Sequence, residues 1–477
     1  MIINPSTNQP FNQPQMNFEG GDPFNSFKQR KFTGNSVNVD IRSVQRQLVR
    51  RSRWLQRNIP VANGILRHIA SRVAPVDAGL RPVVKRKDGT LHKEVNRLLL
   101  KEYTSWLQNC DISGRLGGPK LYNLTSILRC RDGEVFIRFL EGGDLDHNGA
   151  IPLSISLINT DACPIHFTDA SKNIHQGIEV NDYLKPINYL FRRKADNIYG
   201  NNHHLSGRPE SIKDYVIVPS KDIIHYSNMI DVNELRGVPI FHSVIKKLLD
   251  IDDYEAYIQT AAKLSSAIMF QIIRDSSYIR PTTSPIMRSQ ESGDRRYKQW
   301  APGIFYDKLE PGEMVKPIET SSQPITGAEA MFDHILKMVS IGASVPSTVT
   351  TKKYDGSYTA QRMQMIDDKM LSSFNSSDYS ETVIRRLYNR WLECKIVYDG
   401  VSFLSGVDTN TIYDIAFKPP RVPYIDTQKE MTAYKIAREL GITSRTGIIS
   451  NNNEDPNDVF EEIKEENEIF GDLNYEN

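Results

Sequence analysis

The sequence predicts a multidomain α+β protein, and three observations lead to this prediction. The chain has 477 residues, which is too long for one compact core and suits roughly two to four domains. Its apolar pattern changes from helical spacing to strand-like alternation near Glu134. Between Glu234 and Ser357, two helical segments enclose a short strand-rich stretch. We expect the remaining parts of the chain to pack around this helix–strand–helix unit.

Composition limits the classes of partner. The 59 basic and 58 acidic residues give a formal net charge of +1, so any DNA contact must be local rather than a bulk attraction. The four cysteines, Cys110, Cys130, Cys163 and Cys394, form no C-x-x-C pair, so neither a zinc site nor a redox pair is indicated and we expect reduced thiols. No apolar run approaches the roughly 18 residues of a membrane helix, and no secretion signal opens the chain, so we expect a soluble, intracellular protein.

The N-terminal region divides into an arm and a basic helix. Residues 1 to about 36 are rich in Asn and Gln and poor in aliphatic side chains, so we expect them to be disordered or ordered by a partner. Asp40 is placed to cap a helix, and a second helix follows Pro60. The first helix carries arginines with no acid between Ile41 and Pro60, which indicates phosphate contact, pairing with a neighbouring subunit, or simply a solvated face. These arginines are Arg42, Arg46, Arg50, Arg51, Arg53 and Arg57.

A strand-rich region follows two further helices. The helices are expected at 91–110 and 121–130, and the strands at 134–140, 151–158, 177–180, 187–191 and 215–218. Asp144, Asp146, Asn148 and Gly149 resemble part of a calcium loop, but Ile155 stands where a bidentate Glu is needed, so we favour a hairpin turn over a cation site.

The histidines do not indicate a metal or catalytic site. His203 and His204 lack a third ligand at a suitable spacing, and His225 suits a hydrogen-bonded structural role at the end of a strand. The sequence has no Walker loop, no G-x-G-x-x-G cradle and no recognisable nucleophile and base. We therefore expect neither an enzyme nor a bound cofactor or metal.

The enclosing helices define a stalk. Pro239 suits the first turn of a helix that should reach about Ala267, and Thr326 with Glu329 suits the start of a second helix that Pro346 stops. Short strands are expected at 268–273 and 303–306, with a turn at 310–313. An ordinary helical hairpin with an inserted loop is the alternative.

The C-terminal part is mainly helical. We expect a polar loop over 347–357, a long helical tract over 358–395 with a break near Asn375, and helices over 426–440 and from Asp455 onward. From Asn451 the chain carries ten acids and one lysine, which is typical of a solvent-exposed or interaction surface.

An ordered set of segments resembles the lambda-like family of portal proteins from tailed bacteriophages. The matching segments are 57–65, 131–137, 222–225, 234–239, 309–313 and 358–362, and the resemblance spans about Asp40 to Phe470. No single segment is specific, but their order and separations are. The Asn/Gln-rich first 36 residues and the acidic end depart from the family pattern.

The resemblance implies a portal fold with an α/β wing, a helical stem, a small α/β clip and a mainly helical crown. The implied parts are an arm (1–38), the wing (39–235), a stem helix (236–267), the clip (268–324), a second stem helix (325–346), a tunnel loop (347–357), a tunnel helix with further wing (358–425), and a crown with an acidic tail (426–477).

The resemblance also implies a function and its partners. A ring of about twelve subunits would sit at one capsid vertex of the virion after assembly in the host cytoplasm, and DNA would be packaged and later ejected through it. Implied partners are the large terminase subunit, head-tail adaptor proteins, major capsid and scaffold proteins, and double-stranded DNA bound without sequence specificity, with no membrane.

Two groups of residues would then carry these contacts. Channel contacts with DNA would involve the tunnel-loop residues Thr350, Thr351, Lys352, Lys353 and Tyr354, although the two lysines alternatively serve only to keep a surface loop soluble. Contacts of the clip with its partners would involve Arg288, Arg295, Arg296 and Lys298.

Two other classes of function remain open from the residues alone. An enzyme that processes nucleic acid would use the basic helix as its binding face, but would lack a metal or acid/base cluster. A monomeric structural adaptor is the other alternative, which ring formation would exclude.

Overall fold

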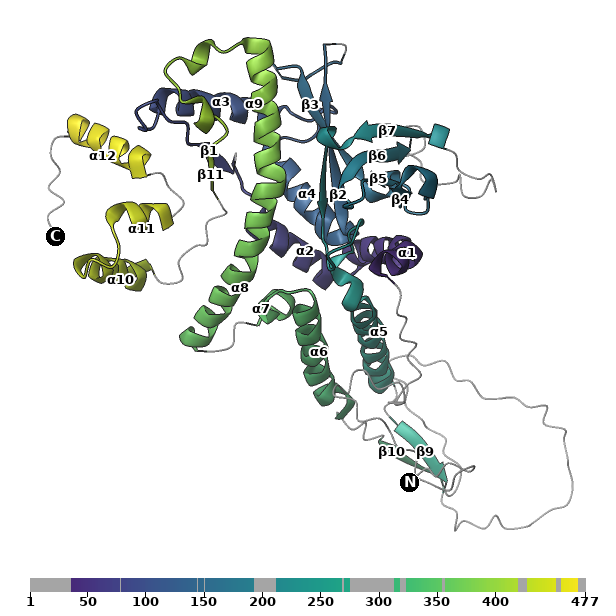
Figure 1. Ribbon diagram of the computed structural model, residues 1–477. Coiled ribbons are helices and arrows are strands. Elements are labelled where there is room, and N and C mark those ends of the chain that lie inside the picture. The colour runs from purple at the N-terminus through teal and green to yellow at the C-terminus, as the bar shows by residue number, and fades with distance from the viewer. Residues whose placement is uncertain are drawn as a thin grey trace, which may run out of the picture.

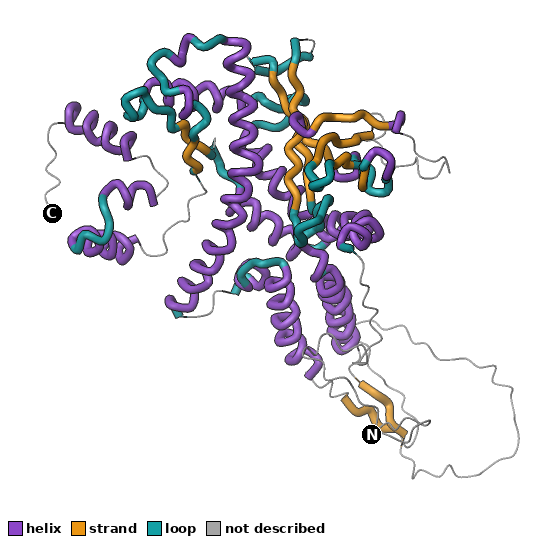
Figure 2. The backbone as a smooth tube through the Cα atoms, viewed as in Figure 1, coloured by secondary structure: helices purple, strands orange, loops and turns teal. Residues whose placement is uncertain are grey.

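The computed structural model describes residues 36–77, 79–143, 145–149, 151–192, 212–267, 270–274, 313–317, 323–353, 357–418, 427–451 and 456–470. The fold is mixed α+β, mostly helical, with small antiparallel sheets, as the sequence predicts at this coarse level (Figure 2). A long helix crosses the middle of the molecule, and two helices project from the main body as a stalk (Figure 1).

The first two helices pack against each other at a proline-directed bend. They are α1 (Val37–Asn58) and α2 (Pro60–Val73). Ile59 between them is extended, as expected for a residue that precedes proline. The buried positions of α1 recur every three or four residues, which gives the helix one apolar face and one arginine-rich face.

Two more helices lead into the first sheet. They are α3 (Lys93–Gln108) and α4 (Gly118–Asp132). Gly133 ends α4 with a φ of +87°, a left-handed conformation that glycine adopts without a Cβ penalty. The chain then enters β2 directly at Glu134.

Two antiparallel sheets pack face to face beside these helices. The first sheet has the strand order β3-β2-β8. Its strands are β2 (Glu134–Glu141), β3 (Leu153–Asn159) and β8 (Ile223–Ser227). The second sheet has the order β4-β5-β6-β7, with β4 (Ile174–His175), β5 (Ile178–Val180), β6 (Pro186–Arg192) and β7 (Tyr215–Pro219). Phe136 of the first sheet packs edge-on against Phe191 of the second, with ring centroids 5.2 Å apart. The predicted hairpin is confirmed, because β2 and β3 pair antiparallel with Ile137 opposite Leu157.

The long central helix has three parts, α8 (Tyr358–Tyr379), a π-helical turn (Ser380–Ile384) and α9 (Arg385–Asp399). The break predicted near Asn375 is wrong, because the irregularity is a wider turn a few residues later and the helix continues through it. Trp391, Tyr388 and Leu387 of α9 are buried in the largest hydrophobic cluster, which also contains α3, α4 and the β3-β2-β8 sheet.

The stalk consists of α5 (Ile245–Ala267) and α6 (Gln323–Gly342), with the hairpin of β9 (Phe270–Arg274) and β10 (Glu313–Pro317) between them (Figure 1). The first helix begins later than predicted, because a 3-10 turn at Ile240–Ser243 separates it from Pro239. The second begins at Gln323 rather than Thr326 and ends before Pro346. The predicted strand at 268–273 is confirmed as β9, whereas the one at 303–306 lies outside the described residues.

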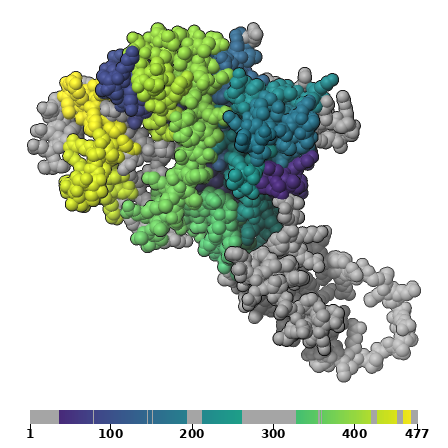
Figure 3. Space-filling view, viewed as in Figure 1, coloured from purple at the N-terminus to yellow at the C-terminus, as the bar shows by residue number. Residues whose placement is uncertain are grey.

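The C-terminal helices lie beside the main body (Figure 3). They are α10 (Thr427–Glu439), α11 (Arg445–Asn451) and α12 (Pro456–Phe470), of which the sequence predicted the first and third. The sequence did not predict the small sheet of β1 (Leu80–Pro82) and β11 (Ile415–Phe417), whose strands lie more than 300 residues apart in the chain.

The described part of the chain also bears on the composition-based predictions. All four cysteines are free and buried, in agreement with the predicted reduced thiols. Among the described helices, none combines the length and the apolar character that a membrane crossing requires.

Candidate functional site

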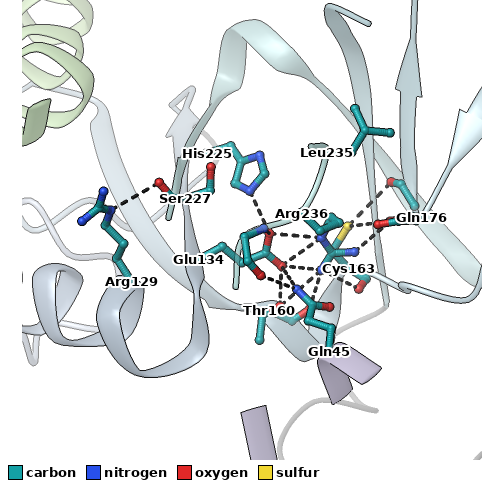
Figure 4. A network of polar contacts seen from close by, with 12 residues as sticks. Gln45, Arg129, Glu134, Thr160, Cys163, Gln176, His225, Ser227, Leu235 and Arg236 are labelled. Atoms are coloured by element: carbon teal, nitrogen blue, oxygen red, sulfur yellow. Dashed lines mark hydrogen bonds and ion pairs between the residues drawn. The ribbon is translucent and has the colours of Figure 1, made fainter. Parts of the chain in front are cut away.

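The base of the stalk is fixed by a buried ion pair between Glu134 and Arg236 (Figure 4). Glu134 is the first residue of β2, and Arg236 lies in the segment that leads into α5. Both side chains are fully buried, and Arg236 Nη2 and Nε lie 2.6 and 2.9 Å from Glu134 Oε1. A guanidinium fork that meets a carboxylate in this way forms two charge-assisted hydrogen bonds in a fixed geometry.

Four further groups bond to the same carboxylate. His225 of β8 lies 2.9 Å from Glu134 Oε2, Gln45 of α1 donates to Oε1 at 3.3 Å, and the hydroxyl of Thr160 also donates to Oε1. The backbone N–H of Gly237 donates to Oε2 at 3.1 Å. One carboxylate therefore joins α1, the end of β3, β8 and the chain entering the stalk.

The protonation of this group follows from its neighbours. Burial raises the pKa of Glu134, but the charge of Arg236 and the hydrogen bond from His225 lower it more, so its pKa lies well below the usual range. Glu134 is therefore ionised at neutral pH. His225 stacks on Phe136 with centroids 4.5 Å apart, which confirms the predicted structural role of this imidazole.

The two backbones beside the ion pair touch through paired glycines. A Cβ on Gly237 would lie 2.1 Å from the carbonyl oxygen of Gly133, and a Cβ on Gly133 would lie 2.6 Å from the backbone of Val238. Asn228 closes the contact, because its backbone N–H donates to the carbonyl of Gly133 and its side chain donates to the carbonyl of Val238. The ion pair and the paired glycines therefore hold the segment that leads into α5 against the end of α4 and the start of β2.

The segment after α6 differs from the predicted loop. Residues Ser347–Thr351 form a short helix, α7, because Pro346 starts a new turn instead of ending all helical structure. Thr350 is buried and bonded to Ser340, with 2.6 Å between their hydroxyl oxygens, and Thr351 donates to the carbonyl of Ser347. Only the stretch from Lys352 to Ser357 remains non-helical or undescribed.

The two lysines of this segment have different surroundings. Lys352 is exposed, with a φ of +53°, whereas Lys353 Nζ lies 2.9 Å from Glu329 and 2.8 Å from Asp333 of α6. Hydrogen bonds to the carboxylates of Asp333 and Glu329 raise the pKa of Lys353 above its ordinary value. Tyr354, the remaining predicted channel residue, lies outside the described residues.

The arginines of α1 are not one uniform face. Arg53 binds Asp132 through two hydrogen bonds, of 3.0 and 2.9 Å, and also pairs with Asp161, so its acidic partners lie in its own chain. Arg42 donates to the carbonyl of His166 at 3.3 Å. The side chains of Arg50, Arg51 and Arg57 are exposed, which fits a solvated helix face, one of the three alternatives for these arginines.

The other predicted site residues fall in two places. The clip residues Arg288, Arg295, Arg296 and Lys298 lie outside the described residues, as does Asp144 of the calcium-like pattern. Asn148 of that pattern donates its side-chain N–H to the carbonyl of Asp111, which pins the turn between β2 and β3. No group of three or more metal-binding side chains occurs within the described ranges.

A stripe of exposed apolar side chains runs along α8. Met363, Ile366, Met370 and Phe374 recur at helical spacing and are 58%, 44%, 67% and 75% exposed. The opposite side of α8 is held to α2, because Asp368 lies 3.0 Å from His68 and 3.1 Å from Arg72. These four side chains therefore form the exposed apolar face of a helix whose other side is anchored to the body.

Sequence reasoning did not identify the Glu134–Arg236 pair as a site. The sequence analysis used Glu134 as the start of a strand, and both residues lie in segments that carry the family resemblance, but it did not pair them. A signal was present, since Glu134 opens a strand that is otherwise mainly apolar, and a buried strand carboxylate needs a cationic partner.

Comparisons of sequence with known proteins point to one family. A family model described as phage portal protein, lambda family, matches residues 25–371. A probable portal protein of Halomonas phage phiHAP-1 is 22% identical over 410 residues, which cover 83% of this chain and 74% of that protein. Among solved structures, a chain from the virion of a native gene transfer agent particle aligns with a TM-score of 0.43 at 13% identity, over 90% of this chain and 96% of that one. A chain from the neck of an empty gene transfer agent particle aligns with a TM-score of 0.45 at 14% identity, over 90% and 97%.

Proposed function

The chain belongs to the lambda family of phage portal proteins, and from this we propose that it forms the ring at one capsid vertex through which DNA is packaged and later ejected. Membership of this family indicates a structural, non-catalytic role. The observation that best supports ring formation is the apolar stripe of α8, which the described chain leaves uncovered.

A closed ring requires two different surfaces on each subunit. Each subunit must present one patch to the next neighbour and a complementary patch to the previous one, so that the contacts close on themselves. The stripe on α8 supplies one such patch on a helix whose other side is anchored to α2. The mass of the purified assembly, measured by light scattering, tests this proposal.

We infer the parts of that ring from the order of the elements. The body from residue 39 to 235 is the wing, α5 and α6 are the stem, and the segment that contains β9 and β10 is the clip. In this proposal the segment around 347–357 faces the channel, and residues 426–477 form the crown and its acidic tail. The buried ion pair supports this assignment, because it joins the body to the segment that leads into α5.

Lys352 and Lys353 are proposed to contact passing DNA. Ring symmetry would repeat each lysine around the channel, where phosphate contacts that read no bases permit sliding. Replacing both lysines by alanine is expected to preserve folding and ring assembly while altering DNA packaging or retention, and replacement by glutamate should have a larger effect. Because Lys353 is already paired with α6, the single change Lys352→Ala should produce most of the effect of the double change.

The measurement is the length and quantity of DNA in particles assembled from each variant. Lys172→Ala, at an exposed lysine of the body, is the matched control and should package normally. Normal packaging and retention of full-length genomes by the double glutamate variant would show that this segment does not contact DNA as proposed.

The clip is proposed to bind the large terminase subunit during packaging and head-tail adaptor proteins afterwards. The hairpin of β9 and β10 lies at the far end of the stalk from the body, which supports this proposal (Figure 1). Replacing Arg288, Arg295, Arg296 and Lys298 by serine should leave rings intact and weaken terminase binding in a pull-down. An unchanged affinity in assembled rings would contradict the assignment.

A further inference from the structure

A polar groove separates the C-terminal helix α12 from the body. Its volume is about 450 Å³, and it lies between α12 on one side and β1 with α3 on the other. Basic side chains of Arg81, Lys93 and Arg97 line the body wall, and acidic side chains of Glu461, Glu462 and Glu465 line the α12 wall. Opposite charges therefore face each other across the groove.

Ion pairs join α12 to the body across this groove. Glu461 accepts hydrogen bonds from Lys93 and, at 3.4 Å, from Arg97, whose side chains are 60% and 81% exposed. Phe460 and Ile463 of α12 each remain 40% exposed. Exposed ion pairs of this kind are weak and salt-screened, so the helix can be displaced.

The two walls are unusual within a chain of balanced charge. The 21 residues from Arg81 to Lys101 contain seven basic and two acidic residues, and α12 contains six acidic residues and one lysine. The pairing with Lys93 lowers the pKa of Glu461, so this carboxylate stays ionised well into mildly acidic solution. The body wall thus presents a local cationic surface that α12 neutralises.

We propose that the basic ledge formed by Arg81, Lys93 and Arg97 is a second nucleic-acid-binding site, which α12 occupies as an internal acidic competitor. This proposal rests on the proposed function in one respect, which is that a portal protein operates in contact with DNA. A duplex displaces α12 because it offers a denser row of negative charge and releases condensed counterions when lysine and arginine bind its phosphates. The ledge reads no base sequence, since its side chains act on phosphates alone.

Binding of a duplex of about 30 base pairs at about 50 mM salt tests this proposal. In the full-length protein, Glu461→Ala with Glu465→Ala is expected to bind the duplex about tenfold more tightly than the unmodified chain, because the competitor is weakened. Adding Lys93→Ala and Arg97→Ala should remove this gain. The affinity of the glutamate variant should also fall steeply with salt, by about 0.9 logarithmic units per logarithmic unit of salt for each phosphate contacted.

Glu466→Ala with Glu468→Ala is the matched control. It removes the same charge from the same helix, but neither residue lines the groove, so its affinity should stay close to that of the unmodified chain. Equal affinity of the two glutamate variants would overturn the competitor role of α12. Retention of the gain after removal of Lys93 and Arg97 would overturn the ledge as the site.

This outcome is distinguishable from a failure of the proposed function. Light scattering on the same samples reports ring assembly, which none of these substitutions should alter. Tighter duplex binding by a glutamate variant that forms no ring would support the basic ledge and contradict the portal ring. Intact rings with unchanged duplex affinity would support the portal ring and contradict the basic ledge.

Discussion

Replacing Arg236 by methionine is expected to lower the free energy of unfolding by about 3–5 kcal/mol, because it leaves the carboxylate of Glu134 buried without its cation. His225, Gln45 and Thr160 would still hydrogen-bond to the carboxylate, but none of them is a permanent charge like the guanidinium. Denaturant unfolding followed by circular dichroism measures the change. Arg57→Met, at an exposed arginine of α1, is the control and should change stability by less than about 0.5 kcal/mol.

The same pair predicts a pH dependence with a defined sign. The pKa of Glu134 is depressed in the folded protein, so its contribution to stability is present above the ordinary carboxyl pKa of about 4.3 and is lost as pH falls below that value. The Glu134→Gln variant lacks this titration, and its stability should fall less than that of the unmodified chain between about pH 5 and pH 3. A destabilisation by Arg236→Met no larger than that of Arg57→Met would show that the pair does not hold the stalk base.

Replacing Met370 and Phe374 by glutamate is expected to abolish ring formation while leaving a folded subunit. Both side chains are exposed in the single chain, so glutamate costs the subunit little, but in a ring contact the new charges would be buried without partners. Light scattering should report monomer, and the thermal unfolding midpoint of the variant should lie within a few degrees of that of a dissociated unmodified subunit.

A control variant separates the apolar stripe from charge alone. Ser105→Glu with Gln108→Glu adds the same charge at exposed positions of α3, away from the stripe. It removes no apolar side chain, and it should still form rings. Rings formed equally well by the Met370/Phe374 variant would exclude the stripe from the subunit contact.

Much of the fold could be predicted because it depends on local periodicity. The helical spacing of apolar residues in α1, α2 and α4, and the short apolar runs of β2 and β6, locate these elements to within a few residues. The stalk was also predictable, since Ala267 ends its first helix as expected and a strand follows almost at once.

Contacts between distant segments could not be predicted in this way. The pairing of β1 with β11 depends on residues more than 300 positions apart, and neither three-residue strand has a detectable period. The loop predicted after Pro346 failed for a different reason, because proline ends one helix but is favoured at the start of the next, which here is α7.

The candidate site shows the same limit. The types of residue at Glu134 and Arg236 are compatible with a buried ion pair, but 102 positions separate them, and only the fold shows that they meet. The paired glycines are likewise unremarkable in the sequence, and their close approach follows from the crossing of two backbones. Lys353 was predicted to face DNA, yet its pairing with α6 depends on how α7 turns back along that helix.

The assembly state of the purified, unmodified protein tests the central claim most directly. Negative-stain imaging combined with light scattering should show closed rings with a central hole, and a mass of about twelve times the 54.4 kDa of the chain. A population of monomers alone at micromolar concentration, with the helices of the wing intact, would contradict the account.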